Sequence, residues 1–191
     1  YYWNRSAESL SKKKARKHLP IEQKESHRWI ESVEKVNKYF NAYPQSTLIN
    51  ICDREGDIYE MLSMEYPAHS HYIIRSCNNR RTQEEEKIWD LVKSQSAIFS
   101  YEIEVFDRQT LKKRNAHLEV KWLPKVELLP TYRKGEKVKA VNVNIIYVQE
   151  KNVPQGIKPI DWKLLTSLPL EIDSELYQAI VYYSYRWRIE T

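Results

Sequence analysis

The chain has 191 residues, of which 41% are hydrophobic and 30% charged, enough apolar material for one sizeable folded domain. Lysine and arginine total 31 against 26 acidic residues, and the net charge of +5 permits a polyanionic partner. The only glycines, Gly56, Gly135 and Gly156, exclude the glycine-rich loops that bind nucleotide phosphates. No apolar run is long enough to cross a membrane, so we expect no membrane partner. Cys52 and Cys77 make no disulfide framework, which favours a cytoplasmic compartment, and Cys52 is expected to be a buried thiol.

The first half of the chain alternates helices with short apolar strands. Hydrophobic residues that recur at threes and fours predict helices, and short apolar runs predict strands buried on both faces. After a basic, irregular stretch, these patterns predict a helix over 21–41, a strand over 47–52, a helix over 58–64 and a strand over 72–74. We expect Asp57 to cap the second of these helices.

The second half of the chain is rich in strictly alternating segments. A short helix is predicted first, over 84–92. Alternation then predicts half-buried antiparallel strands, and a last helix follows them to the end of the chain. The predicted strands are 99–105, 116–122, 141–147 and 162–166, and the last helix begins at Asp173 or Ser174. The fold class is therefore α/β, more loosely α+β, with an α/β layer interrupted by a mainly antiparallel β insertion.

Two carboxylates occupy positions suited to a ligand site. The core-facing stripe of the last helix ends in a carboxylate and comprises Leu176, Ala179, Ile180, Tyr183, Trp187 and Glu190. Asp53 directly follows the strand 47–52, at the carboxyl end where open α/β sheets place their ligands. Oxygen ligands suit magnesium, and two ions roughly 4 Å apart clamp both oxygens of a phosphoryl transfer. Plainer interpretations remain open: Glu190 pairs with Arg186 one turn earlier, and Asp53 is an ordinary turn or cap residue.

Three segments together resemble bacterial insertion-sequence transposases of the DDE type. They are the segment 52–58 (CDREGDI), the segment 72–76 (YIIRS), and Tyr183, Arg186 and Glu190 on one helix. The resemblance covers nearly the whole chain, including the position of the β insertion. It implies a ribonuclease-H-like mixed sheet with flanking helices. The implied divisions are a first part of the core at 1–78, an insertion at 79–170 and a returning core helix at 171–191.

The resemblance also implies the roles of individual residues. Asp53 and Glu190 are the second and third carboxylates of the catalytic triad and ligands of two Mg²⁺ ions, for which Mn²⁺ substitutes. Water, and then the 3′-hydroxyl of the DNA, attacks phosphorus. Four residues are expected to contact DNA: Arg75, Trp162, Tyr183 and Arg186. Trp162 corresponds to an indole that stacks with a flipped base in relatives that use hairpin intermediates, although a packed strand tryptophan is an open alternative.

The resemblance implies a cut-and-paste DNA transposase, acting in the bacterial cytoplasm on double-stranded DNA as a synaptic homodimer. The family's first aspartate belongs on a strand before Tyr1, so we expect the chain to be an inactive middle fragment. The basic clusters 80–81 and 112–114 either track DNA phosphates or are solvated loops. A non-catalytic DNA-binding module and a ribonuclease-H-type nuclease are the alternative functions.

Overall fold

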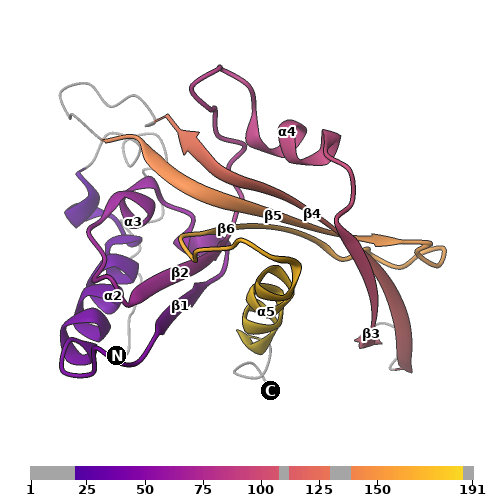
Figure 1. Cartoon of the computed structure of the whole chain (residues 1–191), viewed down its shortest axis with the longest axis horizontal. Helices are drawn as coiled ribbons and strands as arrows, with labels where there is room; N and C mark the ends of the chain where they lie inside the picture. Colours follow the sequence, from indigo (N-terminus) through magenta and orange to yellow (C-terminus); the bar gives the residue numbers. More distant parts are fainter. Residues whose placement is uncertain (1–19, 108–111, 130–138, 187–191) are drawn as a thin grey trace, which may run out of the picture.

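The computed structural model describes residues 20–107, 112–129 and 139–186, which form a mixed α/β fold around one curled six-stranded sheet (Figure 1). The strands are β1 (Leu48–Cys52), β2 (Ser70–Arg75), β3 (Phe99–Asp107), β4 (Lys112–Leu128), β5 (Val141–Lys151) and β6 (Asp161–Thr166). The α-helices of the described residues are α2 (His27–Phe40), α3 (Tyr59–Ser63), α4 (Ile88–Ser94) and α5 (Asp173–Ser184). Single 3₁₀ turns, η2 (Ile21–Gln23) and η3 (Arg54–Gly56), precede α2 and follow β1. The predicted mixture of helices and strands is confirmed at this level.

The sheet has the order β1-β2-β6-β5-β4-β3. Only β1 and β2 are parallel, and the remaining neighbours are antiparallel, as the alternating segments predicted. Because β6 pairs with β2, the strands of the second half continue the sheet that β1 and β2 begin. The division at 1–78, 79–170 and 171–191 stays a prediction. A register shift between Leu123 and Val126 interrupts the long pairing of β4 with β5.

Two apolar cores lie on opposite faces of the sheet. Alternation along β2 sends Tyr72 and Ile74 to the core under α2, α3 and α4, and Ile73 to the core under α5. The predicted stripe of α5 is confirmed for the four members that the structure describes: Leu176, Ala179, Ile180 and Tyr183 are buried. Cys52 is a buried free thiol, as expected.

Four sequence-based expectations about local structure were wrong. The strand β1 is half-buried over 48–51 rather than buried on both faces, since it has one neighbour, β2, in the part of the chain described. The first helix begins at His27, because η2 occupies 21–23. The third helix begins at Ile88 rather than at 84, because 81–87 form a turn closed by a bridge between Arg81 and Lys87, with Glu85 at φ 63°.

Asp57 does not cap α3, contrary to the sequence-based expectation, because the N-cap of α3 is Ile58. The Asp57 carboxylate turns instead toward the segment after β2, where it accepts hydrogen bonds from the backbone N–H groups of Cys77 (2.6 Å) and Asn78 (2.8 Å). It also pairs with Arg80. The aspartate therefore ties the turn after β1 to the turn after β2.

None of the described helices combines the length and the apolar character needed to span a membrane.

Candidate functional site

Asp53 and Arg75 lie side by side at the carboxyl edge of the parallel strand pair. Cys52 of β1 is paired with Ile74 of β2, so Asp53, which follows β1, is level with Arg75, the last residue of β2. Arg75 is itself still paired with Leu164 of β6. This is the edge at which the sequence predicted a ligand site. The Arg75 guanidinium donates a hydrogen bond to the Asp161 carbonyl oxygen (3.2 Å), which brings the start of β6 to the same edge.

Arg186, which is distant from Asp53 and Arg75 in the sequence, also lies at this edge of the sheet. It follows α5, and its Nη1 lies 3.5 Å from Oδ2 of Asp53. The Arg186 side chain is 16% exposed and that of Asp53 is 38% exposed, so the pair is partly screened from solvent. The other carboxylate oxygen, Oδ1 of Asp53, is buried and receives no hydrogen bond from the residues that the structure describes.

Tyr183 lies beneath the pair, fully buried on the inner face of α5. Burial raises the pKa of its phenol, and Arg75 and Arg186 oppose that rise while Asp53 adds to it. The phenol is therefore protonated at neutral pH. These four side chains, which the sequence analysis named as site residues, converge although they come from β1, β2 and the end of α5.

Trp162, the fourth predicted DNA contact, is placed differently. Its indole is 7% exposed and lies in the core under α5. The ring meets Tyr183 edge to face, with centroids 5.4 Å apart. In this position the indole packs against the inner side of the site rather than lining its surface.

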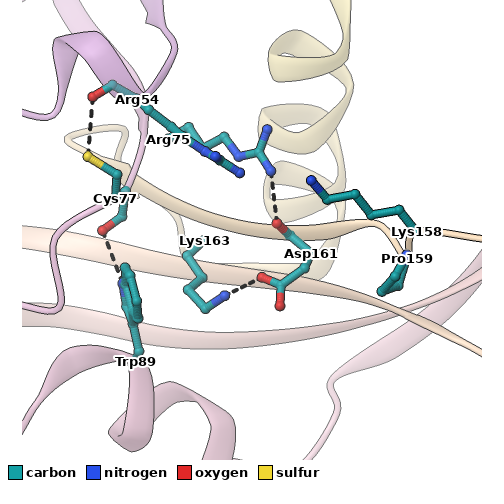
Figure 2. Close-up of a pocket in the computed structure, with 9 residues that line it drawn as sticks. Arg54, Arg75, Cys77, Trp89, Lys158, Pro159, Asp161 and Lys163 are labelled. Carbon is teal, nitrogen blue, oxygen red and sulfur yellow. Dashed lines mark hydrogen bonds and ion pairs between the residues drawn. The ribbon is translucent and has the colours of Figure 1, made fainter.

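A cationic cavity of about 450 Å³ borders the same edge (Figure 2). Its lining shares Arg75 with the Asp53 edge and contains the next residue along the chain, Arg54. The lining residues are Arg54, Arg75, Ser76, Cys77, Trp89, Lys158, Pro159, Asp161 and Lys163. We name this the cationic pocket.

Sequence patterns missed the cationic pocket because its charged residues lie far apart in the chain. Lys158 lies in the stretch before β6, Lys163 lies on β6, Trp89 lies on α4 and Arg54 lies in η3. Arg75 is the one predicted site residue in the lining, and nothing in the sequence places the others beside it. The irregular stretch before β6 carries no periodicity. The sequence offered one indication of the pocket: two residues of opposite charge, Asp161 and Lys163, lie on the same face at the start of the strand that follows this stretch.

The two basic clusters of the sequence analysis are largely engaged within the protein. Arg80 is buried and paired with Asp57, so it is neither a solvated residue nor an exposed DNA contact. Arg114 pairs with Glu150, which is buried, and Lys113 pairs with Glu104 at the surface (2.7 Å).

Of the two predicted ligands of a divalent cation, Asp53 and Glu190, the structure describes only Asp53. Glu190 lies outside the described residues, and among those that are described no three His, Cys, Asp or Glu side chains gather at one point. Asp53 fits the role of a ligand in one respect, because its buried Oδ1 has no hydrogen-bond donor among the described residues. An anionic oxygen left in this way favours a cation beside it.

No model of a known protein family matches the chain.

Proposed function

We propose that the chain is the catalytic core of a DDE-type cut-and-paste DNA transposase, with its first two strands belonging to a ribonuclease-H-like sheet. The observation that carries the proposal is the meeting of Arg186 with Asp53, 3.5 Å apart, beside Arg75 and above Tyr183. The resemblance assigns all four residues to one site. Their convergence at the carboxyl edge of β1 and β2 supports that assignment.

In this proposal the carboxylates hold magnesium. Asp53 and Glu190, both assigned by the resemblance, would be the ligands contributed by this chain, and Oδ1 of Asp53 has no hydrogen-bond donor among the described residues. Mg²⁺ held there would supply a Lewis acid that polarises the scissile phosphate and lowers the pKa of the attacking water.

The remaining residues orient the DNA. Arg75 and Arg186 present guanidinium groups, which bind phosphate oxygens in a fixed two-pronged geometry. Tyr183 is fully buried below these two arginines and protonated at neutral pH, and its contact with DNA stays a prediction. Trp162 supports Tyr183 from below by its edge-to-face contact, and the stacking with a flipped base that the resemblance implies would require the indole to leave the core.

A non-catalytic DNA-binding module is the second candidate. The excess of cations in the cationic pocket favours it, because phosphate binding requires no metal. A ribonuclease-H-type nuclease is the third, and it differs from a transposase in cutting the RNA strand of a hybrid.

The test uses the full-length protein that carries this chain, with the DNA ends of its own mobile element. Strand cleavage in Mg²⁺ and in Mn²⁺ is measured for the wild type, Asp53→Asn and Glu190→Gln. Glu34→Gln, at an exposed position on α2, is the control for loss of one carboxylate. We expect Asp53→Asn and Glu190→Gln to abolish cleavage while DNA binding persists, and Glu34→Gln to cut normally.

Each contrary result has a distinct meaning. Cleavage by Asp53→Asn would show that the site is misassigned. A wild type that binds the DNA ends but never cuts them would favour the binding module. Cleavage confined to the RNA of an RNA–DNA hybrid would favour the nuclease.

A further inference from the structure

The cationic pocket carries more positive charge than its own carboxylate can neutralise. Four cations line it, Arg54, Arg75, Lys158 and Lys163, against the single carboxylate of Asp161. Like charges gathered around one space repel each other, and an anion in that space relieves the repulsion. The volume of about 450 Å³ falls within the range of ligand pockets and exceeds what a single phosphate group requires.

Two of the four cations are already ordered. Lys163 pairs with Asp161, and its Nζ lies 5.1 Å from the ring centroids of both Trp89 and Tyr147. Arg75 is fixed by its hydrogen bond to the Asp161 carbonyl, and Figure 2 shows both side chains directed at Asp161. Side chains held before a ligand arrives lose less conformational entropy when it binds.

The other two cations, Arg54 and Lys158, are exposed. Arg54 comes from η3 and Lys158 from the stretch before β6, and in Figure 2 Lys158 lies beyond Asp161, while the Arg54 side chain overlaps that of Arg75 in this view. An anion that reaches Arg75 therefore lies in a pocket that two further, exposed cations also line. This arrangement suits a phosphate group better than a carboxylate, because a phosphate offers more oxygens for several donors.

One wall of the pocket is apolar and fixed. The Trp89 indole Nε1–H donates to the Ser76 hydroxyl (3.1 Å), and its backbone N–H donates to Oδ1 of Asn79 (3.0 Å). A ring fixed in this way offers a surface for the sugar or base attached to the phosphate.

The pocket is poorly suited to other chemistry. Asp161 is its one carboxylate, and it already pairs with Lys163, so the pocket does not provide a cation site. Cys77 is its one thiol, and burial together with the nearby Asp57 carboxylate raises the pKa of that thiol. The reactive thiolate is thereby disfavoured.

We propose that the cationic pocket binds one nucleotide unit of the DNA strand that enters the Asp53 site, with its backbone phosphate on Arg54, Arg75 and Lys158. This inference rests on the proposed function, and it extends the site along the strand. Arg54 directly follows Asp53, and Arg75 is level with Asp53, so the two subsites share an edge. A DNA strand that spans the Asp53 site and the cationic pocket would contact Arg75 where the two meet.

The test measures DNA affinity of the full-length protein by fluorescence anisotropy, without divalent ions, over a series of KCl concentrations. The variants are Arg54→Gln and Lys158→Gln, both at exposed positions, so the fold is retained and is checked by thermal unfolding. Lys38→Gln, at an exposed position in the last turn of α2, is the matched control. We expect each pocket variant to weaken binding about three- to tenfold. We also expect the slope of log K against log salt to fall by about 0.7 to 0.9, the loss of one phosphate contact.

The outcomes separate this proposal from the proposed function. If Arg186→Gln weakens DNA binding while both pocket variants bind like the wild type and Lys38→Gln, the pocket proposal is overturned and the transposase proposal stands. If the wild type binds no DNA at any salt, both fail. A titration with inorganic phosphate and with a deoxynucleoside monophosphate, followed at the Trp89 indole N–H resonance, is then informative. A saturating shift assigns the pocket to a small phosphate compound instead of a strand.

Discussion

Arg80 and Asp57 form an ion pair that is almost completely withdrawn from water, with 6% of the arginine side chain and none of the aspartate side chain exposed. The pair is embedded in further hydrogen bonds. Arg80 Nη2 donates to the Asp57 carbonyl oxygen (3.0 Å), and Asn78 Nδ2 donates to that carbonyl and to the carboxylate. This network joins the turn that carries Arg54 to the end of β2, which carries Arg75. It therefore links the two segments that carry Arg54 and Arg75.

Removing one partner of this pair is expected to destabilise the protein strongly. Asp57→Ala leaves the Arg80 guanidinium buried without its counter-charge, which costs about 3 to 5 kcal/mol. Urea unfolding followed by circular dichroism measures this loss. The control is Glu104→Ala, which breaks the exposed pair with Lys113 and is expected to leave the urea midpoint almost unchanged. An Asp57→Ala protein as stable as the wild type would mean that the pair is solvated in solution.

Gly56 permits the tight turn that positions Asp53. Its backbone N–H donates to the Asp53 carbonyl (2.9 Å), and a methyl group at Gly56 would lie 2.6 Å from Cβ of Cys52. We expect Gly56→Ala to push η3 away from β1, with a loss of about 1 to 3 kcal/mol in urea unfolding. DNA cleavage should fall as well, because Asp53 moves with η3.

The matched control for this substitution is Gly156→Asn. Gly156 has φ +83° but open space around it, and asparagine tolerates left-handed backbone better than most residues. We expect nearly normal stability and cleavage for Gly156→Asn. A Gly56→Ala protein equal to the wild type in both measurements would show that the turn adjusts without cost.

Stability is expected to decline at alkaline pH. Burial raises the pKa of the Cys52 thiol and of the Tyr147 phenol, each to about 12, and Asp161 adds to the effect on Tyr147. In the unfolded chain a thiol ionises near pH 8.5 and a phenol near 10. Between these values and pH 12 the unfolded state has lost protons that the folded state retains. The free energy of unfolding therefore falls as the pH rises through this window.

Urea unfolding at intervals between pH 7 and pH 11.5 measures this decline. We expect a steady midpoint up to about pH 8 and a steepening fall above it. Tyr147→Phe removes one ionisable group, so its slope should be shallower by up to about 1.4 kcal/mol per pH unit above pH 10. Identical slopes for Tyr147→Phe and the wild type would show that this phenol ionises in the folded protein.

Much of the fold was predictable because its patterns are local. Alternation identified the strands β3, β4 and β5, and the spacing of apolar residues identified the buried stripe of α5. The start of α4 was not predictable. Residues 84–86 are strong helix formers, but the bridge from Arg81 to Lys87 holds them in a turn. Here a tertiary arrangement overrides helix propensity.

The site was predictable only where residues follow a recognisable element. Asp53 directly follows one short apolar strand and Arg75 ends another, and Arg186 lies two residues beyond α5. By contrast, Asp57 was assigned as a cap because its partner, Arg80, lies beyond an intervening strand. The cationic pocket could not be found from the sequence for the same reason: Arg54, Trp89 and Lys158 become neighbours only when the sheet forms.

Trp162 allows a last test, since packing and base stacking make opposite demands on its indole. The ring is 7% exposed and rests against Tyr183, so Trp162→Ala is expected to cost about 3 to 5 kcal/mol in urea unfolding. Trp162→Phe keeps an aromatic edge against Tyr183 and should fold well. We expect the indole to act only through this packing. In that case the processing of DNA ends by Trp162→Phe, expressed per amount of folded protein, equals that of the wild type. A well-folded Trp162→Phe protein that binds DNA ends but fails to process them would show that the indole leaves the core to stack with a base.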